Sequence, residues 1–239
     1  MSDLALQLAL AVIPAILAIT LHEAAHGYAA LALGDDTARQ AGRLSLNPLR
    51  HIDRFGTIIL PGLLLFSQLV MLGRVAFMFG WAKPVPVSAW RFPDPRRYMA
   101  LVALAGPAMN FALAWLGALS LHVSGDNPLV LRFITYFILA NIALGLFNLL
   151  PVPPLDGGRI MVGILPLPLA RIWARLERAG IVLVLLVVFV VPEIARQMGY
   201  AFDPVQLVLE RAMDHALRIV LALAGLHVGP AIPGGGDAV

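Results

Sequence analysis

Apolar residues run in long stretches along this chain, and short polar or proline-rich segments separate them. Three stretches, residues 4–33, 99–121 and 129–150, are long enough to cross the roughly 30 Å hydrocarbon core of a bilayer as helices. A fourth, residues 57–79, is interrupted by Pro-Gly and Gly-Arg pairs, and the proline-rich residues 80–98 indicate extended structure. The pattern predicts an all-α polytopic membrane protein with about five to six transmembrane helices and short extended segments.

The composition supports a membrane protein and excludes several other classes. Of 239 residues, 60% are hydrophobic and only 13% are charged, and the mean hydropathy is +0.85. Such a chain lacks the polar residues to cover a soluble surface, which excludes a soluble enzyme and a nucleic-acid-binding module. The absence of cysteine excludes disulfides and thiolate metal sites. We expect one membrane-embedded domain over residues 1–229 and a disordered, glycine-rich tail over residues 230–239.

The strongest chemical pattern is His22-Glu23-Ala24-Ala25-His26, an H-E-x-x-H sequence inside the first apolar stretch. Residues four apart on a helix share a face, so both imidazoles can bind one metal ion while the carboxylate holds a water molecule. Ionisable groups are costly inside a membrane segment, which favours a functional role. The alternative is a His–Glu pair that is hydrogen-bonded within a helix bundle.

Asp156 is the predicted third ligand, because a catalytic zinc site needs three protein ligands and leaves the fourth position to water. It follows an apolar stretch within residues 148–158, a segment broken by three prolines and two glycines. Irregular backbone at membrane depth is tolerated only where it is buried in protein or lines a wet cavity. The alternative is that Asp156 caps a helix starting at Gly157.

A polar stripe precedes this break. Asn141, Gly145 and Asn148 fall on one face of a helix, a face that lipid would reject. For Asn141, Asn148 and Asn110 the alternative to a place in the site is an interhelical hydrogen bond without a catalytic role.

Three motifs, in this order and spacing, resemble those of the site-2 proteases, which are intramembrane zinc metalloproteases. They are the H-E-x-x-H sequence, residues 105–110 (AGPAMN) and residues 148–158. Residues 43–48 and 80–87 further resemble a compact bacterial and archaeal branch of the family without PDZ or CBS domains. The resemblance covers about residues 15–165.

The resemblance implies a zinc-dependent endopeptidase that hydrolyses membrane-spanning protein substrates within or near the bilayer. It implies one Zn²⁺ per chain, with three protein ligands: His22, His26 and Asp156. Glu23 would be the general base, Asn148 would position the substrate or polarise its carbonyl, and Asn110 would line the site or pack helices. Separately, alternating apolar residues and prolines indicate an extended edge that pairs with an unwound substrate by strand addition. The candidate substrate-binding residues are Asn110, Asn141, Lys83, Pro84, Val85, Pro86 and Val87.

Three other functions remain open. A different membrane zincin would take a glutamate of a later helix as its third ligand, and Glu177, Glu193 and Glu210 are the candidates. A metal transporter would need ligands along a path, whereas this chain shows one cluster. A non-proteolytic scaffold that binds membrane helices would be expected to have lost Glu23 or a ligand.

The loop charges predict the orientation in the membrane. Asp156 and the H-E-x-x-H motif must lie at the same depth in the membrane to share a metal ion. The helices that carry them must therefore run towards the same side, which places the loops before and after residues 57–79 on that side. Residues 57–79 then form a re-entrant or interfacial hairpin. The side that holds this hairpin then carries twelve Lys and Arg residues near the membrane and the other side two, which makes the former cytoplasmic. The twelve are Arg39, Arg43, Arg50, Arg54, Lys83, Arg91, Arg96, Arg97, Arg159, Arg171, Arg175 and Arg178, and the two are Arg132 and Arg196. We expect a prokaryotic plasma membrane protein with an external N-terminus and a zinc site nearer the cytoplasmic face.

Overall fold

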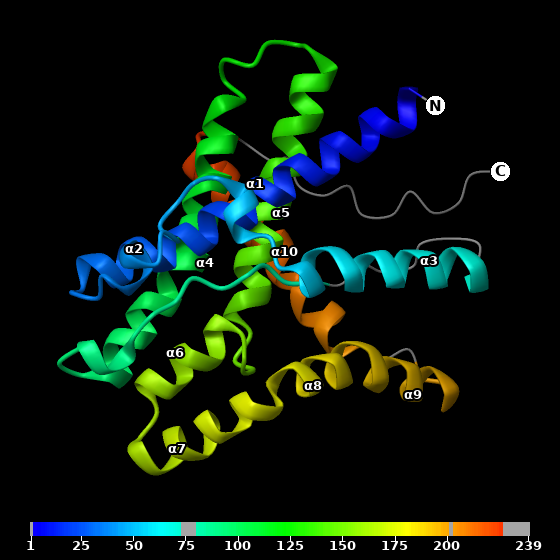
Figure 1. Ribbon diagram of the computed structural model, residues 1–239. Helices are drawn as coiled ribbons and strands as arrows, with labels where there is room; N and C mark the ends of the chain where they lie inside the picture. The colour runs from blue at the N-terminus through cyan, green and yellow to red at the C-terminus, as the bar shows by residue number, and fades with distance from the viewer. Residues whose placement is uncertain (1, 73–79, 201–202, 227–239) are drawn as a thin grey trace.

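The computed structural model describes residues 2–72, 80–200 and 203–226, and this part of the chain contains helices and turns but no strands (Figure 1). The predicted disordered tail, residues 230–239, lies outside the described residues. The α-helices are α1 (Ser2–Ala32), α2 (Thr37–Gln40), α3 (Leu60–Leu72), α4 (Pro95–Ser120), α5 (Pro128–Leu149), α6 (Asp156–Ile164), α7 (Leu167–Leu176), α8 (Gly180–Leu185), α9 (Val191–Gln197) and α10 (Pro204–Leu223). Short 3-10 or π-helical turns are η1 (Pro48–His51), η2 (Arg54–Ile59), η3 (Ala89–Arg91), η4 (Glu177–Ala179) and η5 (Leu186–Val190).

Three of the described helices, α1, α4 and α5, are long and apolar enough to cross a membrane. They correspond to the three long stretches expected from the sequence. The predicted count of five to six transmembrane helices is not confirmed. The apolar residues 181–191 are divided among α8, η5 and the start of α9, and α10 carries four charged residues and a histidine among its 20 residues.

Local capping explains where the two central helices begin. Asp94 and Asn127 accept hydrogen bonds from the first turns of α4 and α5, and a proline follows each of them. A proline suits the first helical position because its missing N–H would have no partner there. Asp94 therefore starts α4 at Pro95, four residues before the expected apolar start at residue 99.

The three spanning helices form the centre of the molecule, and α10 packs against α4 and α5 (Figure 1). An apolar cluster fills the contact among α4, α5 and α10 at the end of α4 that leads into the α4–α5 turn. Its buried members are Ala114, Ala118, Ile134, Ile138, Ile142, Val220 and Ala224. Small residues on α4 allow the branched side chains of α5 to approach closely, which is the usual basis of helix packing in membranes.

A buried aspartate holds the end of α1 against the segment that precedes α4. The fully buried Asp35 carboxylate accepts hydrogen bonds from the Thr37 backbone and hydroxyl and from the Ser88 backbone N–H, and Arg91 lies 3.7 Å from it. Burial alone would raise the pKa of Asp35, but these hydrogen bonds and the Arg91 guanidinium lower it below its ordinary value. These contacts join the end of α1 to Ser88, at the end of the segment over residues 80–88.

The ends of the predicted hairpin segment lie together. The Trp81 N–H donates to the Gly56 carbonyl, and the Thr57 hydroxyl donates to the Trp81 carbonyl at 2.8 Å. Helix α3 has 13 residues, about 20 Å at 1.5 Å per residue, which is shorter than a bilayer core. The return path, residues 73–79, lies outside the described residues.

Candidate metal centre

Three side chains from two helices converge at the centre of the bundle. His22 and His26 lie one turn apart on α1, and Asp156 is the first residue of α6. Asp156 Oδ2 is 3.1 Å from His22 Nε2 and 3.3 Å from His26 Nε2, and the two Nε2 atoms are 3.1 Å apart. Among the described residues, this is the one group of three side chains placed to hold a metal ion.

Hydrogen bonds on the far side of each imidazole determine which nitrogen is free. His22 Nδ1 lies 2.6 Å from Asn110 Oδ1, and His26 Nδ1 lies 2.7 Å from the Val102 carbonyl oxygen. Both partners are acceptors, so both Nδ1 atoms carry the proton of the neutral ring. The two Nε2 atoms therefore direct lone pairs at each other and at Asp156.

This arrangement fits a bound cation. Asp156 Oδ2 is buried and makes no hydrogen bond, although two imidazole nitrogens lie beside it. Three lone-pair donors at such distances repel one another unless they share a positive ion. Two imidazoles and one carboxylate are also a ligand set typical of catalytic zinc.

The turn between α5 and α6 brings Asp156 to the two histidines. Helix α5 ends at Leu149, and Gly157 lies so close to the carbonyl oxygens of Leu149 and Leu150 that a side chain there would overlap them. Leu155, not Asp156, occupies the cap position of α6, and no side chain caps this helix. The alternative of Asp156 as a helix cap is therefore wrong.

A cavity of about 360 Å³ opens beside the cluster. Polar groups on its wall are the three possible ligands together with Glu23, Asn148 and Arg159. Apolar residues from five parts of the chain complete the wall, including Ile19, Val85, Leu144, Leu155 and Val184. The cavity therefore combines an apolar surface with a few convergent polar groups, as ligand sites usually do.

The extended segment over residues 80–88 forms one side of the cavity. Its Lys83 N–H donates to the His51 carbonyl, and its Val85 N–H donates to Glu23 Oε2 at 3.1 Å. Arg43 in turn donates to the carbonyl oxygen of Lys83 at 2.8 Å. The Val85 amide thus fixes one oxygen of the Glu23 carboxylate beside the metal cluster.

The sequence of this chain is similar to those of known peptidases. The model of peptidase family M50 matches residues 126–192, which contain Asn141, Asn148 and Asp156. A Bacillus subtilis protein named "Putative zinc metalloprotease YwhC" is 40% identical over 190 residues, covering 76% of this chain and 80% of that protein. The chain belongs to peptidase family M50.

Family membership confirms the resemblance to site-2 proteases and makes the protein an integral membrane metalloprotease. Mycobacterium tuberculosis Rip2, which carries the same description as YwhC, is 31% identical over 144 residues, covering 59% of this chain and 52% of Rip2. These names indicate zinc as the metal. No solved structure gives a significant match to the chain.

The candidate substrate-binding residues occupy three different places. Pro84 and Val85 line the cavity, whereas Lys83, Pro86 and Val87 belong to the same extended segment but not to the lining. Asn110 and Asn141 are fully buried, do not line the cavity, and are hydrogen-bonded to each other at 2.9 Å.

Two contributors to the site are not assigned a role from the sequence. The Val102 carbonyl is a backbone group, so its side chain gives no indication of its contact with His26. A Cβ atom on Gly106 would lie 2.5 Å from ring atoms of both His22 and His26. Gly106 was part of a recognised motif, and its position next to Pro107 could have indicated a close helix contact.

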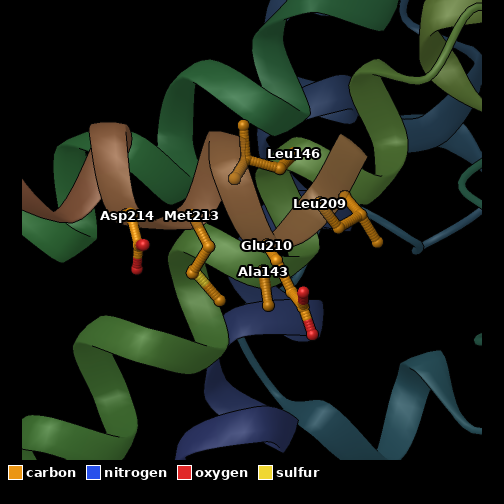
Figure 2. Close-up of a pocket in the computed structure, with 6 residues that line it drawn as sticks. All are labelled: Ala143, Leu146, Leu209, Glu210, Met213 and Asp214. Carbon is orange, nitrogen blue, oxygen red and sulfur yellow. The ribbon is translucent and has the colours of Figure 1, made fainter. Parts of the chain in front are cut away.

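A second pocket of about 440 Å³ lies between α5 and α10 (Figure 2). Glu210 and Asp214 stand one turn apart on α10, opposite Ala143 and Leu146 of α5. No histidine lines this pocket. Of the three glutamates considered as alternative third ligands, Glu177 pairs with Arg159 and Glu193 with Arg196, and Glu210 lies in this second pocket.

Proposed function

We propose that this protein is an intramembrane zinc endopeptidase of the H-E-x-x-H type that cleaves membrane-spanning proteins. One observation carries the proposal: the three possible ligands and Glu23 face a single cavity beside the spanning helices α1 and α5. A transporter would need ligands along a path. Among the described residues there is one such cluster, so a protease is favoured.

In this proposal one Zn²⁺ per chain is held by His22, His26 and Asp156. A zinc ion held there would supply a Lewis acid for the scissile carbonyl and a water whose pKa is lowered to around 7. Glu23 takes the proton from the attacking water and delivers it to the leaving amine. The Val85 N–H holds one Glu23 oxygen, which leaves the other oxygen available for this proton.

Asn148 is proposed to polarise the substrate carbonyl from the α5 side of the cavity. Its amide nitrogen now donates to the Leu144 carbonyl at 3.0 Å, and an amide has a second N–H to offer. Arg159 lies on the same wall and is paired with Glu177. Because Arg159 is already paired with Glu177, the uncharged Asn148 amide is the donor that we propose for the substrate carbonyl.

A membrane-spanning substrate must unwind near its cleavage site, because a helix hides its amides in its own hydrogen bonds. We propose that residues 83–87 receive the unwound segment. The amides of Lys83 and Val85 already have partners, and Pro84 and Pro86 have no N–H. The substrate would therefore pair mainly by donating its own N–H groups to carbonyl oxygens of this segment other than that of Lys83, which already accepts from Arg43.

Purified protein tests the metal and the reaction separately. We expect about one zinc per chain in the wild type and in Glu23→Gln, and none in His26→Ala. In co-expression with candidate single-span membrane proteins, the wild type cleaves a substrate that Glu23→Gln leaves intact. If the wild type binds zinc but, like Glu23→Gln, cleaves none of the candidate substrates, a non-proteolytic scaffold would be favoured instead. Zinc content that survives His26→Ala would contradict the proposed ligands.

The orientation is part of the proposal: an external N-terminus, a zinc site nearer the cytoplasmic face, and a hairpin over residues 57–79. The contact between Gly56 and Trp81 supports two ends on one side. Leu49 and Trp90 are 72% and 77% exposed, and the chain has no cysteine. Single cysteines at these positions should react with an impermeant reagent from the cytoplasmic side. Labelling from opposite sides would overturn the hairpin.

A further inference from the structure

A line of hydrogen bonds connects the backbone of α5 to the imidazole of His22 through two asparagines. Asn141 Nδ2 donates to the Phe137 carbonyl at 2.8 Å. Asn110 Nδ2 donates to Asn141 Oδ1 at 2.9 Å and to the Ala18 carbonyl at 3.3 Å. Asn110 Oδ1 then lies 2.6 Å from His22 Nδ1. The line therefore joins all three spanning helices at the metal cluster.

The direction of this line is set by its two backbone carbonyls. A carbonyl oxygen only accepts, so the Phe137 carbonyl orients the NH₂ group of Asn141 towards itself and leaves Asn141 Oδ1 facing α4. Asn141 Oδ1 and the Ala18 carbonyl then take both N–H groups of Asn110. The remaining atom, Asn110 Oδ1, must face His22. It accepts the Nδ1 proton and leaves the Nε2 lone pair for a metal ion.

We propose that Asn141 is a positioning residue for the zinc ligand His22 and acts through Asn110. The inference rests on the proposed function, since the role of His22 as a ligand is part of that proposal. Asn141 does not line the cavity, so its role differs from substrate binding. It keeps the Asn110 amide from turning over, which would present an N–H to His22 and favour the imidazole tautomer that cannot bind metal through Nε2.

The contrasting role for Asn141 is simple adhesion between α4 and α5. Adhesion would affect the stability of the bundle and leave the metal affinity of the folded protein unchanged. Positioning would affect the metal site even where the bundle is stable. Outer hydrogen-bond partners of metal ligands typically change metal affinity by about 10- to 100-fold, so the two roles are separable by measurement.

The experiment compares Asn141→Leu, which removes the acceptor at similar volume, with Asn141→Asp, whose neutral carboxyl group can donate its O–H to the Phe137 carbonyl and still accept from Asn110. Full-length protein in detergent is titrated with Zn²⁺ against a competing chelator, and the visible spectrum of the Co²⁺ form is recorded. We expect about a tenfold loss of affinity and a changed spectrum in Asn141→Leu, and recovery of both in Asn141→Asp. Thr135→Leu is the matched control: a polar side chain on the same helix, six residues away, is exposed and donates only to the Leu131 carbonyl, so its replacement should leave metal affinity within about twofold.

A double variant tests whether Asn141 acts through Asn110. In an Asn110→Leu background the Asn141→Leu change should cause no further loss of affinity, since the connection is already broken. Additive losses, or wild-type affinity and spectrum in Asn141→Leu, would overturn the proposal. If Asn141→Leu does not fold, Asn141→Ala removes the same acceptor, and wild-type affinity in that variant would equally overturn the proposal. A wild type that binds no metal would instead refute the proposed function.

Discussion

Helices α4 and α5 meet in two regions of different chemistry. Beside the metal cluster the contact is polar and made by Asn110 and Asn141, both fully buried. Towards the α4–α5 turn it is apolar, with Ala114 and Ala118 on α4 against Ile138 on α5. The same pair of helices therefore uses hydrogen bonds in one region and close packing in the other.

The difference shows which region holds the bundle together. Interhelical hydrogen bonds in membrane proteins contribute only about 0.6 kcal/mol on average, because the unfolded chain in the membrane also finds partners. Apolar packing of small against branched residues brings the helices together at little polar cost. Adhesion alone therefore explains the two asparagines poorly, and the hydrogen bonds that connect Asn141 through Asn110 to His22 explain their position better.

The largest change in stability is expected in the apolar region. Ile138→Ala removes a buried branched side chain from the cluster with Ala114 and Ala118 and should lower the free energy of unfolding by about 2–5 kcal/mol. Thermal unfolding in detergent measures this change. The folded fraction should still bind zinc as the wild type does. A loss of zinc affinity in folded Ile138→Ala would remove the distinction between the two regions.

Two glycines on α4 provide a matched pair for the metal site. A Cβ atom at Gly106 would lie 2.5 Å from ring atoms of His22 and His26, whose Nδ1 atoms are both held in place. A misplacement of about 1 Å in a catalytic group can cost about 100-fold, so Gly106→Ala should reduce cleavage at least about 100-fold and release zinc.

Gly117→Ala is the control for that change. Its Cβ atom would meet Ile138 Cγ1 at 3.0 Å in the apolar region, far along α4 from the histidines. We expect full zinc content and nearly full cleavage after a small adjustment of Ile138. Equal losses in Gly106→Ala and Gly117→Ala would mean that any added methyl group on α4 harms the site.

The sequence predicts the long apolar helices and the three side chains that converge at the candidate metal centre for physical reasons. Long apolar stretches are local signals, and the i, i+4 spacing of His22 and His26 is local too. Asp156 follows a break in an apolar stretch, and irregular backbone at membrane depth must be buried in protein or line a wet cavity. The sequence therefore indicates that Asp156 lies inside the protein. These features therefore needed no tertiary information.

Other parts depend on how helices approach one another, which no local pattern determines. The carbonyl of Val102, the space left by Gly106 and the partners of Asn110 all follow from the contact of α4 with α1. The predicted number of spanning helices is not confirmed, because hydropathy alone cannot distinguish one straight span from shorter helices such as those of residues 180–197.

Asp35 is a buried polar residue that does not belong to the metal cluster. Asp35 is as buried as Asn110 but holds loop backbone, so Asp35→Asn should reduce stability by about 1–3 kcal/mol and leave zinc affinity unchanged. The folded protein lowers the pKa of this carboxyl below its ordinary 3.8. Its contribution is therefore complete above about pH 4 and is lost as the pH falls towards the folded pKa.

Unfolding of zinc-free protein at pH 7 and below pH 4 measures this effect, and the gap between wild type and Asp35→Asn should shrink at the lower pH. Asp36→Asn is the control, since the neighbouring Asp36 carboxylate pairs with Arg91 but is more exposed, and a smaller change is expected. A gap that widens as the pH falls would contradict the assignment.

The smallest effect is expected at the acidic pocket between α5 and α10 (Figure 2). Its Glu210 was an alternative third ligand, yet neither it nor Asp214 belongs to the group that contains His22. Glu210→Gln and Asp214→Asn should therefore retain about one zinc per chain, whereas Asp156→Asn should lose it. Metal analysis of the three purified variants compares the two acidic sites directly. If Glu210→Gln loses zinc and Asp156→Asn keeps it, the third ligand would be Glu210 on α10. Helix α10 would then have to move towards the histidines of α1.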